Sequence, residues 1–180
     1  MLNTETESAQ FHDGAYGASG SAPKLTTETK TYVTFDLSGQ TLGVEVSNVR
    51  EILDKVEIKK IPNASSRVEG LVDIRGESIP IIDIRSQLGM HHSDDGKDNR
   101  IIVFEVSKGA ERQPVGIIAD RVRDVTQIVS DQIEAPSDLI ASADADGDML
   151  GLARHDDLLI FLLDINSLLK IDFDSSGFSL

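Results

Sequence analysis

Apolar and polar residues alternate along several short stretches of the chain. Residues 31–37 read TYVTFDL, with Val, Phe and Leu at every second position, which is typical of a β-strand with one buried face. Brief helical patterns occur at residues 85–89 and 166–170. Six further stretches are short, rich in β-branched residues or leucine, and bounded by glycine, asparagine, aspartate or proline; these are residues 42–49, 68–76, 78–84, 100–106, 115–122 and 157–165. Many closely spaced strands without long helices predict an all-β fold of small barrels or a sandwich.

Both ends of the chain lack this pattern. Residues 1–29 are mostly Ser, Thr, Gly, Ala and Glu. Such a composition cannot bury enough apolar surface to offset chain entropy, so it predicts a disordered N-terminal arm. Residues 171–180 are expected to form a frayed tail. The folded part is therefore expected to span residues 30–170.

An internal repeat divides this folded part. Residues 32–37 (YVTFDL) resemble residues 102–106 (IVFEV), with Phe35 matched to Phe104. Residues 43–52 (GVEVSNVREI) resemble residues 116–125 (GIIADRVRDV), and residues 69–88 resemble residues 150–169. Chance likeness between two amphipathic β units is the alternative, but glycines and acidic residues match in order as well as apolar positions. One copy of about 70 residues is marginal for a core of its own. The repeat predicts two similar β lobes packed together, at roughly 30–95 and 96–170, with interleaved strands.

Composition narrows the class of protein. The chain has 17 Lys and Arg against 31 Asp and Glu, a net charge of −14, which argues against nucleic acid or an anionic membrane surface as partner. It has no cysteine, which excludes disulfides, thiol catalysis and thiolate metal sites. Its apolar runs are far shorter than the roughly 20 residues of a membrane span, and its start lacks the pattern of a signal peptide. We expect a soluble, cytoplasmic protein.

The order of short motifs between residues 30 and 170 resembles the CheW family, the coupling proteins of bacterial chemotaxis. These motifs are G-V-x-V, V-x-E-I-L, I-P-N-A, V-x-G-L-V-D-I-R-G-x-x-I-P-I-I-D-I-R, I-I-V-F, V-G-I-I-A-D-x-V-x-D-V and L-L-D-I. The resemblance implies two five-stranded, SH3-like β-barrels with short helices. It also implies a non-enzymatic adaptor, without cofactor or metal, between a chemoreceptor's cytoplasmic tip and the regulatory domain of the histidine kinase CheA. The chemosensory pathway, motility or another, is left open.

The segment GLVDIRG (70–76) is the strongest site candidate. In an alternating strand Leu71, Asp73 and Arg75 share one face. The resemblance places a receptor contact at Arg75, whose planar guanidinium suits carboxylates and carbonyl groups; family members commonly have Asn where this chain has Asp73. The alternative is that Arg75 only pairs with Asp73. Because the other repeat has Asp156 at the matching position, the arginine is not required by the scaffold.

Residues 49–51 form the second candidate. The resemblance places Val49 and Glu51 near the groove between the lobes, where receptor helices dock, which completes a receptor-binding set of Val49, Glu51, Gly70, Asp73 and Arg75. The alternative is that Val49 is a core residue and Glu51 a solvated one. The resemblance puts the kinase contact on the second lobe, in residues of about 107–140.

Functions of other classes need features that are weak in this sequence. An acid–base hydrolase could use Asp83 or Asp164 with His155, but no nucleophile accompanies them, and both aspartates precede short helical patterns that they are expected to cap. A ligand-binding β-barrel would need an apolar cavity inside a lobe. The acidic stretch 143–148 lacks the spacing of a calcium loop.

Deletion of residues 1–29 tests the predicted arm. Because this segment has few large apolar residues to bury, we expect the melting temperature to change by no more than a few degrees and partner binding to persist. Thermal melting and binding assays on the full and shortened chains measure this. A large loss of either would show that the arm docks onto a lobe.

Overall fold

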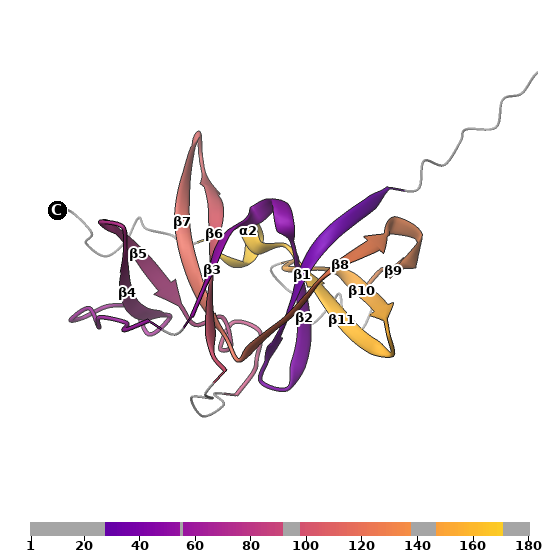
Figure 1. Ribbon diagram of the computed structural model, residues 1–180, viewed down its shortest axis with the longest axis horizontal. Helices are drawn as coiled ribbons and strands as arrows, with labels where there is room; N and C mark the ends of the chain where they lie inside the picture. The colour runs from indigo at the N-terminus through magenta and orange to yellow at the C-terminus, as the bar shows by residue number, and fades with distance from the viewer. Residues whose placement is uncertain (1–27, 55, 92–97, 138–146, 171–180) are drawn as a thin grey trace, which may run out of the picture.

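The computed structural model of the chain describes residues 28–54, 56–91, 98–137 and 147–170 (Figure 1). Its strands form two sheets, and the predicted all-β fold with two lobes and short helices is confirmed. The six-stranded sheet has the order β8 (Arg121–Val129), β1 (Thr29–Leu37), β2 (Gln40–Glu45), β11 (Leu158–Leu163), β10 (Met149–His155) and β9 (Ile133–Glu134). The five-stranded sheet has the order β3 (Val49–Leu53), β6 (Arg100–Lys108), β7 (Glu111–Ala119), β5 (Glu77–Ile82) and β4 (Val68–Ile74). Short helical turns complete the fold: η1 (Val46–Asn48), η2 (Ser130–Gln132) and α2 (Ile165–Leu168).

Each sheet takes strands from both halves of the chain. The repeat matches β1, β2, β3, β4 and β5 with β6, β7, β8, β10 and β11, respectively. When each strand of the run β8-β1-β2-β11-β10 is replaced by its repeat partner, the order of the five-stranded sheet, β3-β6-β7-β5-β4, results. In both sheets the fourth of these strands joins the third in parallel, as β11 with β2 and as β5 with β7. The two sheets are therefore copies of one another built by exchange of strands.

Several predicted elements have different bounds in the structure. The stretch 42–49 is not one strand, because β2 ends at Glu45 and η1 leads into β3. The stretch 115–122 contains the end of β7 and the start of β8, separated by Asp120. The helix predicted at residues 85–89 is wrong: the segment is a turn, which ends at Gly89 with a φ of 66°. The helix predicted at 166–170 is present as α2.

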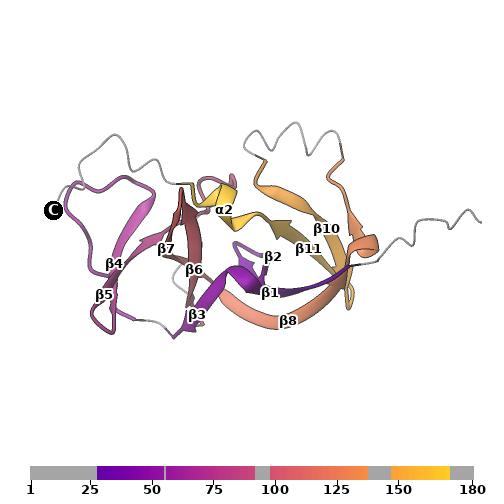
Figure 2. The same cartoon turned by 90° about the horizontal axis from the view of Figure 1, so that it is seen from above.

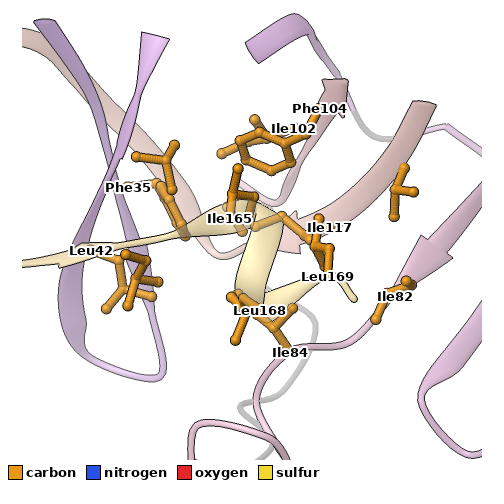
Figure 3. Close-up of a cluster of buried hydrophobic side chains, with 14 of the residues drawn as sticks. Phe35, Leu42, Ile82, Ile84, Ile102, Phe104, Ile117, Ile165, Leu168 and Leu169 are labelled. Atoms are coloured by element: carbon orange, nitrogen blue, oxygen red, sulfur yellow. The ribbon is translucent and has the colours of Figure 1, made fainter. Parts of the chain in front are cut away.

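Helix α2 lies between the two sheets (Figures 1 and 2), and the largest apolar cluster contains residues of both sheets and of α2. Phe35 and Leu42 come from the six-stranded sheet, Phe104 and Ile117 from the five-stranded sheet, and α2 inserts Leu168 between them (Figure 3). Each lobe has a smaller cluster of its own: Tyr32, Ile128, Ala153, Ile160 and Leu162 in one, and Val72, Ile79, Ile81, Ile101 and Val103 in the other. Contact between the lobes thus supplies most of the core.

Strand β1 is buried on both faces. Phe35 lies in the central cluster, whereas Tyr32, on the opposite face, is 2% exposed inside the six-stranded lobe. The alternation of TYVTFDL identified the strand, but its more polar face is not solvent-exposed. Burial also raises the pKa of the Tyr32 hydroxyl.

The folded part begins slightly before the predicted boundary. Thr29 is the first residue of β1. Before it, the backbone of Glu28 accepts a hydrogen bond from the Ser130 amide (2.8 Å) and donates one to the Ser130 hydroxyl (3.2 Å). Residues 1–27 and 171–180, on which the predicted arm and tail fall, lie outside the described residues. In the part of the chain that the structure describes, no helix has the length and apolar character needed to cross a membrane.

Glycines at matching positions of the repeat allow neighbouring segments to pack closely against the backbone in both sheets. A Cβ at Gly43 would lie 2.9 Å from Cδ2 of Leu162, and one at Gly116 would lie 2.5 Å from Cδ1 of Ile81. The repeat matches Gly70 with Gly151, and both stand at register shifts in their hairpins. At each of these two, an added Cβ would meet a backbone carbonyl oxygen of a neighbouring segment, that of Lys59 or that of Glu134.

Substitution of Gly151 by alanine tests this close approach. Its Cβ would lie 2.8 Å from the Glu134 carbonyl oxygen, which cannot rotate away. We expect Gly151→Ala to lower the free energy of unfolding by about 1–3 kcal/mol, the usual cost of overpacking. Gly43→Ala is the matched control and should cost less, because its Cβ would meet side-chain atoms and no backbone carbonyl group. Urea unfolding of both variants gives the comparison, and equal losses would contradict it.

Candidate functional site

Arg75 lies at the tip of the β4–β5 hairpin. The last cross-strand pair is Ile74 with Glu77, which leaves Arg75 and Gly76 as a two-residue loop with φ values of 54° and 84°. Positive φ at both positions is what the twist of a tight hairpin favours. The expectation that Arg75 shares a strand face with Leu71 is therefore wrong, because the strand ends before Arg75.

The Arg75 side chain is 87% exposed. A terminal nitrogen of its guanidinium lies 4.0 Å from a carboxylate oxygen of Glu51. A left-handed backbone conformation costs a residue with a Cβ roughly 1–2 kcal/mol, and asparagine or glycine is the usual occupant of such a turn. An exposed arginine at this position does not serve the turn. Strain of this kind at an exposed side chain makes Arg75 a candidate for a functional role.

Asp73 stabilises the turn itself. Its Oδ1 accepts a hydrogen bond from the backbone N–H of Gly76 at 3.1 Å. Among the residues that the structure describes, the ion pair of Arg75 is with Glu51 and not with Asp73. The alternative in which Arg75 only pairs with Asp73 therefore has no support in the geometry.

The other lobe has the same turn with different side chains. In the β10–β11 hairpin the last pair is His155 with Leu158. Asp156 and Asp157 fill the loop with φ values of 46° and 63°. The structure thus places Asp156 at the position equivalent to Arg75. The backbone of this hairpin is common to both lobes, whereas the guanidinium belongs to one.

Strand β3 brings further charged residues to the same place. The Glu51 side chain is 21% exposed, and its carboxylate lies 3.8 Å from Nε of Arg50. Arg50 also reaches Glu77 at 2.7 Å and Glu105 at 3.3 Å. The hydrogen bond to Glu77 raises the pKa of the Arg50 guanidinium. We call Arg50, Glu51, Arg75 and Glu77 the Arg75 surface.

Sequence reasoning missed several residues near the Arg75 surface and along β3. Glu77 and Glu105 were not singled out, because their role depends on which strands β3 and the hairpin tip approach. Ile52 and Val46 are each 41% exposed on and just before β3, and the alternation of residues 49–53 is the signal that could have found Ile52. Val49 packs against the central cluster, which agrees with the alternative that it is a core residue.

Gly70 lies away from the Arg75 surface. It is buried, has a φ of 153°, and an added Cβ would meet the carbonyl oxygen of Lys59. Lys59 and Leu71 exchange backbone hydrogen bonds of 2.8 and 2.9 Å beside it. The geometry gives this glycine a structural role at the outer edge of β4.

The two aspartates considered as catalytic acids are engaged with backbone and arginine groups. Asp164 accepts hydrogen bonds from the amides of Asn166 (3.0 Å) and Ser167 (3.3 Å), so its predicted capping role is confirmed. Asp83 is 7% exposed and accepts from the amide of Arg85 at 2.9 Å, but residues 85–89 form a turn, so the predicted helix cap at Asp83 is wrong. His155 is at the exposed end of β10, 3.3 Å from Asp156.

Ligand and metal sites have little geometric basis in the described residues. Within residues 28–54, 56–91, 98–137 and 147–170, no three His, Asp or Glu side chains are grouped so as to hold a metal ion. Most of the acidic stretch 143–148 lies outside the described residues. The interior of each lobe contains its own apolar side chains. Surface hollows of about 300 and 310 Å³ lie beside the turn 88–91 and beside the segment 56–60.

The segment expected to contact a kinase spans several elements. Residues 107–112 form the tip of the β6–β7 hairpin, and residues 121–134 contain β8, η2 and β9; residues 138–140 lie outside the described part. Strand β9 pairs with β10. On the adjoining β10–β11 hairpin Leu150, Leu158 and Leu159 are 46%, 37% and 38% exposed, a feature that sequence reasoning did not single out.

Comparisons with known proteins agree on one family. The model of the CheW-like domain matches residues 31–173. The chemotaxis protein CheW of Thermotoga maritima is 30% identical over 139 residues, which cover 77% of this chain and 86% of that protein. Chemotaxis protein CheW of Klebsiella aerogenes is 28% identical over 149 residues, covering 82% and 87%. The crystal structure of the scaffolding protein TtCheW from Thermoanaerobacter tengcongensis is similar with a TM-score of 0.69 at 29% identity, covering 81% of this chain and 95% of that chain. The chain belongs to the CheW family.

Proposed function

We propose that this protein is a non-enzymatic adaptor that couples chemoreceptors to the histidine kinase CheA in the cytoplasm. The observation that carries the proposal is the exposed Arg75 on a hairpin tip, held at a φ of 54°. Membership of the CheW family supports the adaptor proposal, since the relatives are chemotaxis proteins and the similar crystal structure is that of a scaffolding protein.

The Arg75 surface is the part that we assign to the receptor. A guanidinium has five N–H donors in a planar fork, and a contact of 4.0 Å to Glu51 leaves it able to bind an incoming carboxylate or carbonyl group. An exposed ion pair contributes only about 0–1 kcal/mol, so exchanging Glu51 for a receptor group costs little. Exposed Ile52 follows Glu51 on β3, and exposed Val46 lies in η1, which leads into that strand.

The kinase surface is assigned to the six-stranded lobe, on the β10–β11 hairpin and the adjoining β9. Leu150 and Leu159 are exposed there, whereas the repeat places Glu69 and Ser78 at the equivalent positions of the other lobe. Apolar residues that only one copy exposes favour a protein interface over a scaffold role. Figure 1 shows the β4–β5 and β10–β11 hairpins at opposite ends of the molecule, so the two partners would not compete for space.

Substitution of Arg75 tests the receptor surface. Arg75→Ala should change the free energy of unfolding by less than about 1 kcal/mol, because the side chain is exposed. Arg75→Asn should keep or raise stability, since asparagine suits the left-handed turn. Both should weaken binding of a receptor signalling fragment by roughly 1–3 kcal/mol, the value of a charge-assisted contact. Chemical unfolding and titration with the fragment give the two quantities.

Asp156→Asn is the matched control in the other hairpin and should leave receptor affinity unchanged. Asp73→Asn should act weakly, because an asparagine side-chain oxygen can still accept from the Gly76 amide. The receptor assignment would be wrong if Arg75→Asn bound the fragment as well as the unmodified chain does.

Co-sedimentation with the kinase regulatory domain tests the second surface. Leu159→Gln should weaken kinase binding by at least about 1 kcal/mol, roughly a fivefold loss, as truncation of an interface anchor does. Receptor-fragment binding should be unchanged, and Arg75→Asn should show the reverse pattern. A chain that bound no regulatory domain from its own organism, yet hydrolysed a substrate, would overturn the adaptor proposal.

A further inference from the structure

Arg85 is a buried charged residue that the two binding surfaces do not use. It follows β5 and is 4% exposed. One terminal nitrogen of its guanidinium lies 3.2 Å from Oδ1 of Asp83, and the other lies 2.5 Å from Oδ1 of Asp120. Burial of an ion pair is seldom a gain over apolar packing, so its presence calls for a reason other than stability.

Asp120 stands where the chain crosses between the two sheets. It is the single residue between β7, in the five-stranded sheet, and β8, in the six-stranded sheet. Its amide donates to the carbonyl oxygen of Asp36 at 2.9 Å, and its Oδ2 accepts from the amide of Ser38 at 2.6 Å. Arg85 therefore connects the end of β5 in one sheet, through Asp120, to the β1–β2 turn in the other.

The equivalent junction on the other side of the molecule has no such charges. The repeat matches Arg85 with Asn166, Asp120 with Ser47, and Ser38 with Ser107. There Oδ1 of Asn166 accepts directly from the amide of Ser107 at 3.2 Å. At this junction the neutral side chain of Asn166 makes the contact between α2 and β6, so the repeated fold does not require an arginine at this position.

The central cluster between the sheets is apolar, and apolar contact is not directional. Charge-assisted hydrogen bonds from a guanidinium are directional and fix the groups that they join. We propose that Arg85 is a positioning residue: by binding Asp120 at the crossing, it sets the orientation of the two sheets. If the proposed function holds, the orientation of the sheets also sets the angle between the Arg75 surface on one sheet and the β10–β11 hairpin on the other; this step rests on the proposed function.

The absence of cysteine makes this orientation directly measurable. Cysteines introduced at Ser78, exposed on β5, and Gln127, exposed on β8, would carry one spin label on each sheet. Pulsed electron spin resonance then gives the distribution of distances between the sheets. We expect Arg85→Met to roughly double the width of that distribution, because the sheets sample more orientations. Asn166→Ala, at the equivalent junction, should leave the width unchanged.

Arg85→Met removes the positive charge that faces Asp83 and Asp120, so a second variant keeps the test decisive if this one fails to fold. The double substitution Arg85→Met with Asp120→Asn removes both charges while an amide oxygen can still accept from Ser38. Circular dichroism and melting identify which variants are folded. An unchanged distance distribution in a folded variant that lacks Arg85 would overturn the proposal.

Binding is measured on the unlabelled chain. In the folded Arg85 variant, affinity for the receptor fragment alone and for the kinase regulatory domain alone should stay within roughly twofold of the unmodified chain, because neither surface is altered. Assembly of all three components should fall. A broadened distribution with full three-component assembly would overturn the link between orientation and coupling. Failure of the unmodified chain to bind either partner would instead contradict the proposed function, and the distance measurement would still decide the role of Arg85.

Discussion

The apolar contact between the two sheets is the interaction on which the rest of the structure depends. Neither lobe has a large core of its own, since each has a small cluster beside the common one. The central cluster joins residues of both sheets with α2 (Figure 3). Because a unit of about 70 residues is only marginally able to form a core of its own, the two copies of the repeat pack around a common one.

Exchange of strands between the copies determines where the candidate binding residues lie. Strand β3 starts in the five-stranded sheet directly after η1, which follows β2 of the other sheet. This crossing brings Glu51 against the β4–β5 hairpin tip. The opposite crossing, at Asp120, is one residue long and is held by Arg85. The chain thus passes between the sheets at positions that also support the Arg75 surface and the sheet orientation.

The two copies share backbone geometry and differ in side chains. Both hairpins have two-residue loops with positive φ, but one has Arg75 and the other Asp156. Near the end of β5, Arg85 binds the crossing residue Asp120, which accepts from Ser38, whereas after β11 the neutral Asn166 accepts from Ser107. A duplicated scaffold needs only the common features, so the differences between the copies are where binding and positioning roles are to be sought.

Local patterns in the sequence determined the elements and the family. Alternation predicted β1, ordered motifs predicted a CheW-type fold, and the position of Asp164 before a short helical pattern predicted its capping role. These features depend on neighbours within a few residues along the chain. The partner of Arg75 in β3, the burial of both faces of β1 and the crossing at Asp120 were decided only by the tertiary structure. Each depends on strands that pair across long sequence separations, and periodicity within a single strand contains no information about which strand lies beside it.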